Sequence, residues 1–383
     1  MVATDTPTPD TPTPGATTPA APTPRAEPRL AIRRVEMADV GAIAGSAISA
    51  FCLMWLVYVR LTQLSGGVGF AICWYLTFVV TYWLVVREQH GALAAKDKVA
   101  GVVVATAGIG CLVPLTLVIG FTVWKGWQTL RLNFFTETQQ FTGPLSKATD
   151  GGGIHAIVGT LQQVGIAAVL SVPLGVLTAL FLNEIGGRFA RPVRIVVDAM
   201  SATPSILAGL FIYAVIVLEL DWKRDGIAVA LALTVLMLPT VTRTAEVVLR
   251  LVPGGLREGA LALGGTEWRV TRQVVLPTAR TGLVTAVLLG IARVVGETAP
   301  LLVVNAGAFV MNANPFAGNQ EGLPLFIYRY INFPQPARKD AAWTAAFVLI
   351  MIVLVLFTAA RLIGGRAPVA RRAVVRRKQR EPA

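Results

Sequence analysis

Eight long apolar stretches constrain this chain more than any other feature of its sequence. They lie at residues 40–59, 66–86, 99–124, 156–183, 199–218, 226–247, 281–304 and 341–360. A helix needs about 20 apolar residues to cross the hydrocarbon core of a membrane. Of the 383 residues, 54% are hydrophobic and 14% charged, a balance far from that of a soluble globular protein. The sequence therefore predicts an all-α polytopic integral membrane protein.

The positions of Lys and Arg predict the orientation of these helices. If both termini lie in the cytoplasm, the cytoplasmic segments hold 23 of the 34 Lys and Arg residues and the outside loops hold 9. Cytoplasmic loops retain positive charge, so we expect a multi-pass protein of the cell inner (cytoplasmic) membrane with both termini inside. The net charge of +13 then points to membrane lipids as a partner, because no motif supports binding to nucleic acid.

The chain divides into four predicted parts. Residues 1–38 form a Thr/Pro-rich cytoplasmic tail that has too little apolar surface to fold and is expected to be disordered. Residues 39–98 form an N-terminal extension of two transmembrane helices, and residues 99–362 form a six-helix transmembrane core. Residues 363–383 form a basic cytoplasmic tail. The charged residues inside the predicted spans all lie in the core, so we expect function to reside there.

The sequence gives no sign of enzymatic chemistry. Cys52, Cys73 and Cys111 have only His90 and His155 as possible co-ligands, and their spacing matches no metal site. A phosphate-binding P-loop requires Gly-Lys followed by Ser or Thr, and the sequence contains no Gly-Lys pair. No nucleophile–base pair or cofactor loop is visible either. We therefore expect no catalytic residue, no metal and no cofactor in this chain.

A charged segment broken by glycines, residues 251–280, separates two of the apolar stretches. Pro253 suits the first turn of a short helix, and Gly264 is placed to end that helix in a left-handed turn. Thr266 can cap a second short helix with Glu267 in its first turn, and Pro277 would mark the start of the next span. The segment predicts a helix–turn–helix at the cytoplasmic surface, suited to a groove of a soluble partner.

This segment resembles the EAA motif of ABC importer permeases. The matching residues are Glu258, Gly259, Ala260, Gly264, Val274, Leu276 and Pro277, with Gly259 where Ala is usual and Val274 where Ile is usual. The resemblance implies that the loop is a coupling helix seated on a separate ATPase, which would bind ATP and Mg²⁺. The alternative is an amphipathic loop that lies on the membrane.

Two arginines interrupt otherwise apolar stretches, each with a glutamate one turn further on. Arg243 precedes Glu246 by three residues and Arg293 precedes Glu297 by four, so each arginine can meet its own glutamate on one helical face, or the two pairs can exchange partners between helices. Such charges in a membrane are costly and face a bundle interior or a pathway. The chemistry leaves two roles open: the pairs clip helices together, or the guanidinium groups present forked donors to a tetrahedral oxyanion.

Pro204 lies inside the predicted span 199–218. This proline can loosen the helix, and the hydroxyl groups of Ser201, Thr203 and Ser205 can satisfy the freed backbone groups or line a wet path. The alternative interpretation is an ordinary proline kink near the end of a helix.

Five strings resemble phosphate-specific ABC transporter permeases, and the A subunit of these more than the C subunit. They are "GGGIHAIVGTL" (151–161), "ATPSILAGLF" (202–211), "VTRTAEVVLRLVPGGLREGALALG" (241–264), "ARVVGETAPLL" (292–302) and "GLPLFIYRY" (322–330). The resemblance implies the fold of an ABC importer permease, with Arg243, Glu246, Arg293 and Glu297 in the translocation pathway. It also implies three partners: an ATP-binding cassette ATPase dimer, a second homologous permease subunit and an extracytoplasmic phosphate-binding protein.

These features together predict a permease subunit of an ATP-driven inorganic phosphate importer, with no enzymatic activity of its own. One alternative is an ABC permease for another oxyanion, such as sulfate or molybdate. A second is a proton-coupled secondary anion transporter, in which Glu246 and Glu297 would carry protons and no ATPase would be needed.

Overall fold

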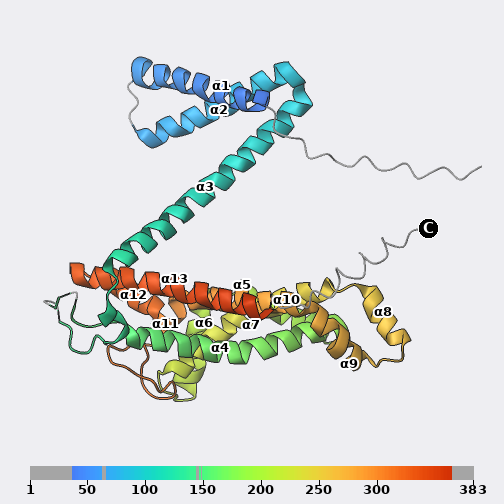
Figure 1. Cartoon of the computed structure of the whole chain (residues 1–383), viewed down its shortest axis with the longest axis vertical. Coiled ribbons are helices and arrows are strands. Elements are labelled where there is room, and N and C mark those ends of the chain that lie inside the picture. Colours follow the sequence, from blue (N-terminus) through green and yellow to red (C-terminus); the bar gives the residue numbers. More distant parts are fainter. Residues whose placement is uncertain (1–36, 63–65, 144–145, 148, 365–383) are drawn as a thin grey trace, which may run out of the picture. The chain divides into compact units, whose positions relative to one another are not determined.

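The computed structural model describes residues 37–62, 66–143, 146–147 and 149–364 (Figure 1). Every regular element in these ranges is helical, which confirms the all-α class. Within them, seven helical runs are long and apolar enough to cross a membrane, and a bent pair of helices counts as an eighth if the pair is one broken span. The predicted tails, 1–36 and 365–383, lie outside the described residues.

Residue contacts divide the chain into two units, Met1–Val113 and Pro114–Ala383, and the division falls within helix α3. The elements of the first unit are α1 (Met37–Trp55), the π-helical turn η1 (Leu56–Leu61), α2 (Gly67–His90) and the first part of α3 (Ala92–Thr129). Phe78, Tyr82 and Val86 lie in its core, and a 2.5 Å ion pair between Asp39 and Lys98 joins α1 to α3. The domain boundaries predicted above stay predictions.

The second unit holds the rest of the helices. They are η2 (Leu132–Phe135), α4 (Ile154–Leu180), η3 (Phe181–Ile185), α5 (Ala190–Ala202), α6 (Ser205–Ile212), η4 (Tyr213–Glu219), α7 (Gly226–Arg250), α8 (Gly254–Ala262), α9 (Glu267–Val270), η5 (Thr271–Val275), α10 (Leu276–Val295), α11 (Ala299–Val304), α12 (Leu323–Ile331) and α13 (Pro336–Gly364). Helices α8 and α9 lie at one end of this unit, and α11 and α12 lie towards the other (Figure 1).

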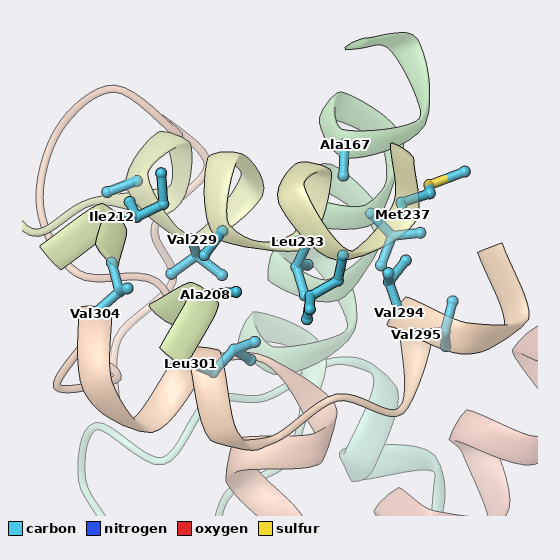
Figure 2. Packing of buried hydrophobic residues seen from close by; sticks show 14 of the residues in the cluster. Ala167, Ala208, Ile212, Val229, Leu233, Met237, Val294, Val295, Leu301 and Val304 are labelled. Carbon is cyan, nitrogen blue, oxygen red and sulfur yellow. The ribbon is translucent and has the colours of Figure 1, made fainter. Parts of the chain in front are cut away.

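Helix α7 is the centre of the second unit. In its most apolar window 61% of the residues are buried, against at most 33% in any other candidate span. Leu233 and Met237 of α7 pack against side chains from α4, α6, α10 and α11 (Figure 2). Helices packed in lipid gain little from the hydrophobic effect, so close contact between them depends on shape.

Two glycines let α10 approach α7 closely. A Cβ atom added at Gly282 would lie 2.4 Å from Cγ1 of Val248, and one added at Gly290 would lie 2.6 Å from Cγ2 of Val241. Both distances are too short for a real side chain. The interface between these two helices therefore requires glycine at both positions.

The predicted span 199–218 is wrong as a single helix. Helix α5 ends at Ala202 and α6 begins at Ser205, and the two segments meet at an angle of 107°. Thr203 takes an extended conformation, with φ −70° and ψ 125°, as expected for a residue that precedes a proline. Pro204 therefore breaks the span completely, which neither interpretation of the sequence anticipated.

The predicted span 281–304 is also wrong at both ends. Its helical run starts earlier, at Glu267, and continues through η5 into α10. Pro277 lies in the first turn of α10, as predicted, although the run begins ten residues before it. The π-helical turn η5 ends at Val275, two residues before Pro277, which has no N–H to donate. At the other end α10 stops at Val295, and a short break leads to α11.

A buried carboxylate orders the connection between α11 and α12. Glu321 is 2% exposed, and its Oε2 atom accepts a hydrogen bond from the backbone N–H of Ala308 (3.0 Å) and pairs with Arg329 (3.2 Å). Burial raises the pKa of Glu321 to about 7, although the charge of Arg329 opposes the shift. The folded protein therefore binds a proton at Glu321 more tightly than the unfolded chain does.

This raised pKa predicts a pH-dependent contribution to stability. The stabilisation from proton binding at Glu321 is present at low pH and is lost as the pH rises through about 7. We therefore expect Glu321→Gln to gain thermal stability relative to the wild type when the pH is raised from about 5 to about 8. Thermal unfolding of the purified protein across this range measures the difference. The exposed Glu219→Gln is the matched control, and the same pH trend in both variants would contradict the assignment.

Candidate functional site

A buried glutamate near the end of α7 is surrounded by arginines. Glu246 is 3% exposed, and its two carboxylate oxygens bond three guanidinium groups. Oε1 accepts from Arg194 (2.8 Å) and from Arg250 (2.5 Å), and Oε2 accepts from Arg243 (2.8 Å). The predicted contact between Arg243 and Glu246 is confirmed. We refer to Arg194, Asp198, Arg243, Glu246 and Arg250 as the Glu246 cluster.

Helix α5 supplies the part of this cluster that the sequence did not predict. Arg194 and Asp198 lie four residues apart on α5, and Asp198 forms an ion pair with Arg243 of α7. Val197 is the only buried residue of α5. The ion pairs with α7, more than apolar packing, therefore position this helix.

The two carboxylates of the cluster differ in how readily they can be replaced. The side chain of Glu246 is 4% exposed, whereas that of Asp198 is 57% exposed. Three guanidinium groups and two carboxylates leave the cluster with an excess of one positive charge. An incoming anion can replace Asp198 at Arg243 without breaking the buried contacts of Glu246. The geometry thus provides one fixed and one exchangeable partner for Arg243.

The second predicted pair, Arg293 and Glu297, is not formed, and that expectation is wrong. Helix α10 ends at Val295, and Gly296 leads into a non-helical turn, so the two residues do not share a helical face. Arg293 is exposed and Glu297 is partly buried. Within the described part of the chain neither side chain has a hydrogen bond or an ion pair. The two arginines therefore have different surroundings: Arg243 is paired and Arg293 is free to meet a partner.

The predicted helix–turn–helix is present with two differences. Gly264 has φ +83°, and the hydroxyl of Thr266 accepts from the N–H of Arg269, as predicted. Pro253, however, caps α8 and does not lie in its first turn. The second helix is also not separate, because α9 continues into η5 and α10.

The surface of this loop carries the predicted motif. Glu258, Gly259, Gly264 and Pro277 are exposed, while Ala260 and Leu276 are partly buried. Large apolar side chains lie beside them: Leu256, Leu261, Leu263 and Trp268 are exposed, and Leu263 is 91% exposed. A short helix with exposed apolar and acidic side chains is suited to docking in a groove.

Arg257 connects α8 to two of the long helices. Its Nη2 atom donates to the carboxylate of Glu184 in η3 (2.9 Å) and to the backbone carbonyl of Leu249 in α7 (2.9 Å). Both side chains of the ion pair are largely buried, at 25% and 15% exposure. Arg257 therefore bonds α8 to η3, which follows α4, and to the end of α7.

Sequence reasoning missed five of these residues: Glu184, Arg194, Asp198, Arg250 and Arg257. The Arg194–Asp198 spacing of four residues was a visible signal of a charged helical face. The contact between Arg257 and Glu184 joins residues 73 positions apart. No local pattern identifies such a pair.

Several transport proteins are similar to this chain. One is a solved structure described as the "MetNI methionine ABC transporter" in an inward-facing conformation. The match covers 55% of this chain and 91% of the chain in that structure, with a TM-score of 0.44 and 24% sequence identity. The "Phosphate transport system permease protein PstA 1" of Mycobacterium tuberculosis is 41% identical over 270 residues, which are 70% of this chain and 88% of the relative. The "Phosphate transport system permease protein PstA" of Haemophilus influenzae is 34% identical over 286 residues, or 73% of this chain and 95% of the relative.

The family match falls on the region that contains these features. Residues 171–367 match the family described as "Binding-protein-dependent transport system inner membrane component". This range includes the Glu246 cluster, the Arg293 region and the loop that carries the EAA-like motif. The chain belongs to the family of binding-protein-dependent transport system inner membrane components.

Proposed function

We propose that this chain is a permease subunit of an ATP-driven importer of inorganic phosphate. The observation that carries the proposal is the position of Arg243 between the buried Glu246 and the exposed Asp198. Guanidinium groups bind tetrahedral oxyanions through forked, charge-assisted hydrogen bonds. The relatives at 41% and 34% identity, both named phosphate transport permeases, support phosphate as the oxyanion.

In this proposal phosphate replaces Asp198 at Arg243 while Glu246 stays in place. Arg293 and Glu297 lie next to the break between α10 and α11, unpaired with each other, and take part in the same pathway. An extracytoplasmic phosphate-binding protein delivers the ion, and a second homologous permease subunit completes the pathway. Both termini of the chain lie in the cytoplasm.

Energy for transport comes from a partner in this scheme. An ATP-binding cassette ATPase dimer binds ATP and Mg²⁺, and its closure moves α8. The ion pair between Arg257 and Glu184 passes this movement to α4, and the bond to Leu249 passes it to α7. Because α7 carries Arg243 and Glu246, movement of α8 changes the site where the anion binds. This chain contributes no catalytic residue and holds no cofactor.

Uptake of radiolabelled phosphate tests the proposal. Cells that lack this gene are compared with cells in which it is restored, in the presence of excess unlabelled sulfate. Restored uptake that sulfate does not reduce supports phosphate as the cargo, whereas competition by sulfate or molybdate supports the other oxyanions. Uptake that collapses with the proton gradient and persists without the ATPase would instead identify a secondary transporter.

The role of the arginines predicts the effect of removing their charge. We expect Arg243→Gln to lower phosphate uptake by at least about 100-fold, because the loss of charge-assisted hydrogen bonds to a bound anion costs about 3 kcal/mol. Arg293→Gln should also abolish uptake with the complex still assembled. Arg191→Gln, an exposed arginine one turn before Arg194 on α5, is the matched control. Loss of the assembled complex in the two site variants would support the alternative in which these residues only clip helices together.

The coupling loop gives an independent prediction. Gly264 has φ +83°, and a residue with a Cβ costs about 1–2 kcal/mol in that conformation, so Gly264→Val should uncouple ATP hydrolysis from uptake. Charge reversal at Glu258 and Arg257→Gln should do the same, and the ATPase should still bind the Arg257 variant. The control is Gly255→Ala in α8, a position outside the motif where an added Cβ meets nothing within 4 Å. ATPase rate and uptake are measured together, and unchanged uptake in all three variants would contradict a coupling role.

A further inference from the structure

A small polar cavity lies between the segment that precedes α4 and the turn that joins α12 to α13. Its volume is about 40 Å³, and it contains no residue of the Glu246 cluster. One water molecule needs roughly 10–15 Å³ of such accessible cavity volume. The cavity therefore has room for about three waters or for one small tetrahedral ion. The predicted topology places it on the extracytoplasmic side.

Two polar groups of this cavity have no partner. Tyr330 is 2% exposed, and its hydroxyl makes no hydrogen bond within the described residues. The Oε1 atom of Gln335 is buried and unbonded in the same way. Polar groups buried without a partner are costly, so both atoms require a ligand. Burial raises the pKa of Tyr330 to about 12, so its hydroxyl keeps its proton and acts as a donor.

Positive charge also lines the cavity. The guanidinium group of Arg338 lies over the rings of Tyr330 (5.6 Å) and Phe333 (4.5 Å), and no carboxylate among the described residues forms an ion pair with it. Helix α13 begins at Pro336, so the positive end of a 29-residue helix lies at the wall. Arg131 and Lys147 also line the cavity.

Two carboxylates restrict which anion fits. Asp150 and Asp340 line the cavity with Arg131, Lys147 and Arg338, which leaves an excess of one positive charge. A fully deprotonated anion would face these carboxylates and the Gln335 oxygen with nothing to donate. An oxyanion that still carries a proton can accept from Tyr330 and Arg338 and donate to one of these oxygens.

We propose that this cavity binds one hydrogen phosphate ion before it reaches the transmembrane pathway. Hydrogen phosphate is tetrahedral and fits the available volume. It also carries a proton at neutral pH, whereas sulfate carries none. The choice of phosphate over other protonated oxyanions rests on the proposed function. The site itself rests on the unpaired hydroxyl of Tyr330, the free charge of Arg338 and the helix terminus.

Equilibrium binding of ³²P-labelled orthophosphate to the purified complex, without its binding protein, tests this site. The complex carries Arg243→Gln so that the transmembrane site is weakened. We expect Tyr330→Phe to weaken the remaining binding about tenfold, as the loss of one hydrogen bond to an anion predicts. Arg338→Gln should weaken binding by at least as much, and excess unlabelled sulfate should not compete.

The chain offers a matched control for each variant. Tyr328→Phe removes a hydroxyl two residues away from an exposed position, and Lys339→Gln removes a charge next to Arg338. Neither residue lines the cavity, so neither change should alter binding.

Several results would overturn the site. The first is the absence of orthophosphate binding at millimolar concentration, and the second is an equal loss of binding in the two control variants. The others are full competition by sulfate and a cavity occupied by retained phospholipid that labelled orthophosphate does not displace. The proposed function can fail separately. If the purified complex binds orthophosphate in a Tyr330-dependent way but cells show no phosphate uptake, the site stands and the proposed function fails. If cells take up phosphate but the purified complex shows no such binding, only the site fails.

Discussion

The charge of Glu246 constrains the position of everything around it. An ionised carboxylate buried without partners costs several kcal/mol, so its three guanidinium groups have to stay within bonding distance. Arg243 and Arg250 reach it from the same helix, but Arg194 comes from α5. Because α5 buries only Val197, this ion pair determines where α5 lies and therefore where Asp198 meets Arg243.

The arrangement combines rigidity and exchange at one arginine. The Glu246 side chain that Arg243 contacts is 4% exposed, whereas that of Asp198 is 57% exposed. A site that binds a cargo and then releases it needs donors that are held in place but not permanently occupied. Arg293 has no partner within the described residues, so it is unoccupied but is not held in place by an ion pair.

Much of the fold could be predicted from sequence because lipid imposes strong rules on it. Long apolar runs have to be helices, and the motif around Glu258 and Gly264 specified a turn whose left-handed glycine is present. The breaks at Pro204 and Gly296 were missed, because hydropathy measures whether a segment is apolar and not whether it is straight. The Arg293–Glu297 pair was wrong for the same reason, since spacing along a helix means nothing beyond the residue where the helix ends. Arg194 and Glu184 reach their partners across the tertiary fold, which a single sequence does not reveal.

The two breaks have a mechanical consequence. Helix α6 follows the break at Thr203–Pro204, α11 follows the break after Val295, and a Cβ at Gly209 of α6 would lie 2.8 Å from Cα of Pro300 in α11. The long helices α7 and α10, by contrast, pack directly against each other where Gly282 and Gly290 of α10 face Val248 and Val241 of α7. Along the chain, α6 and α11 are therefore each joined to the preceding helix only through a non-helical turn, so a change in the orientation of this pair would not require a long helix to unfold.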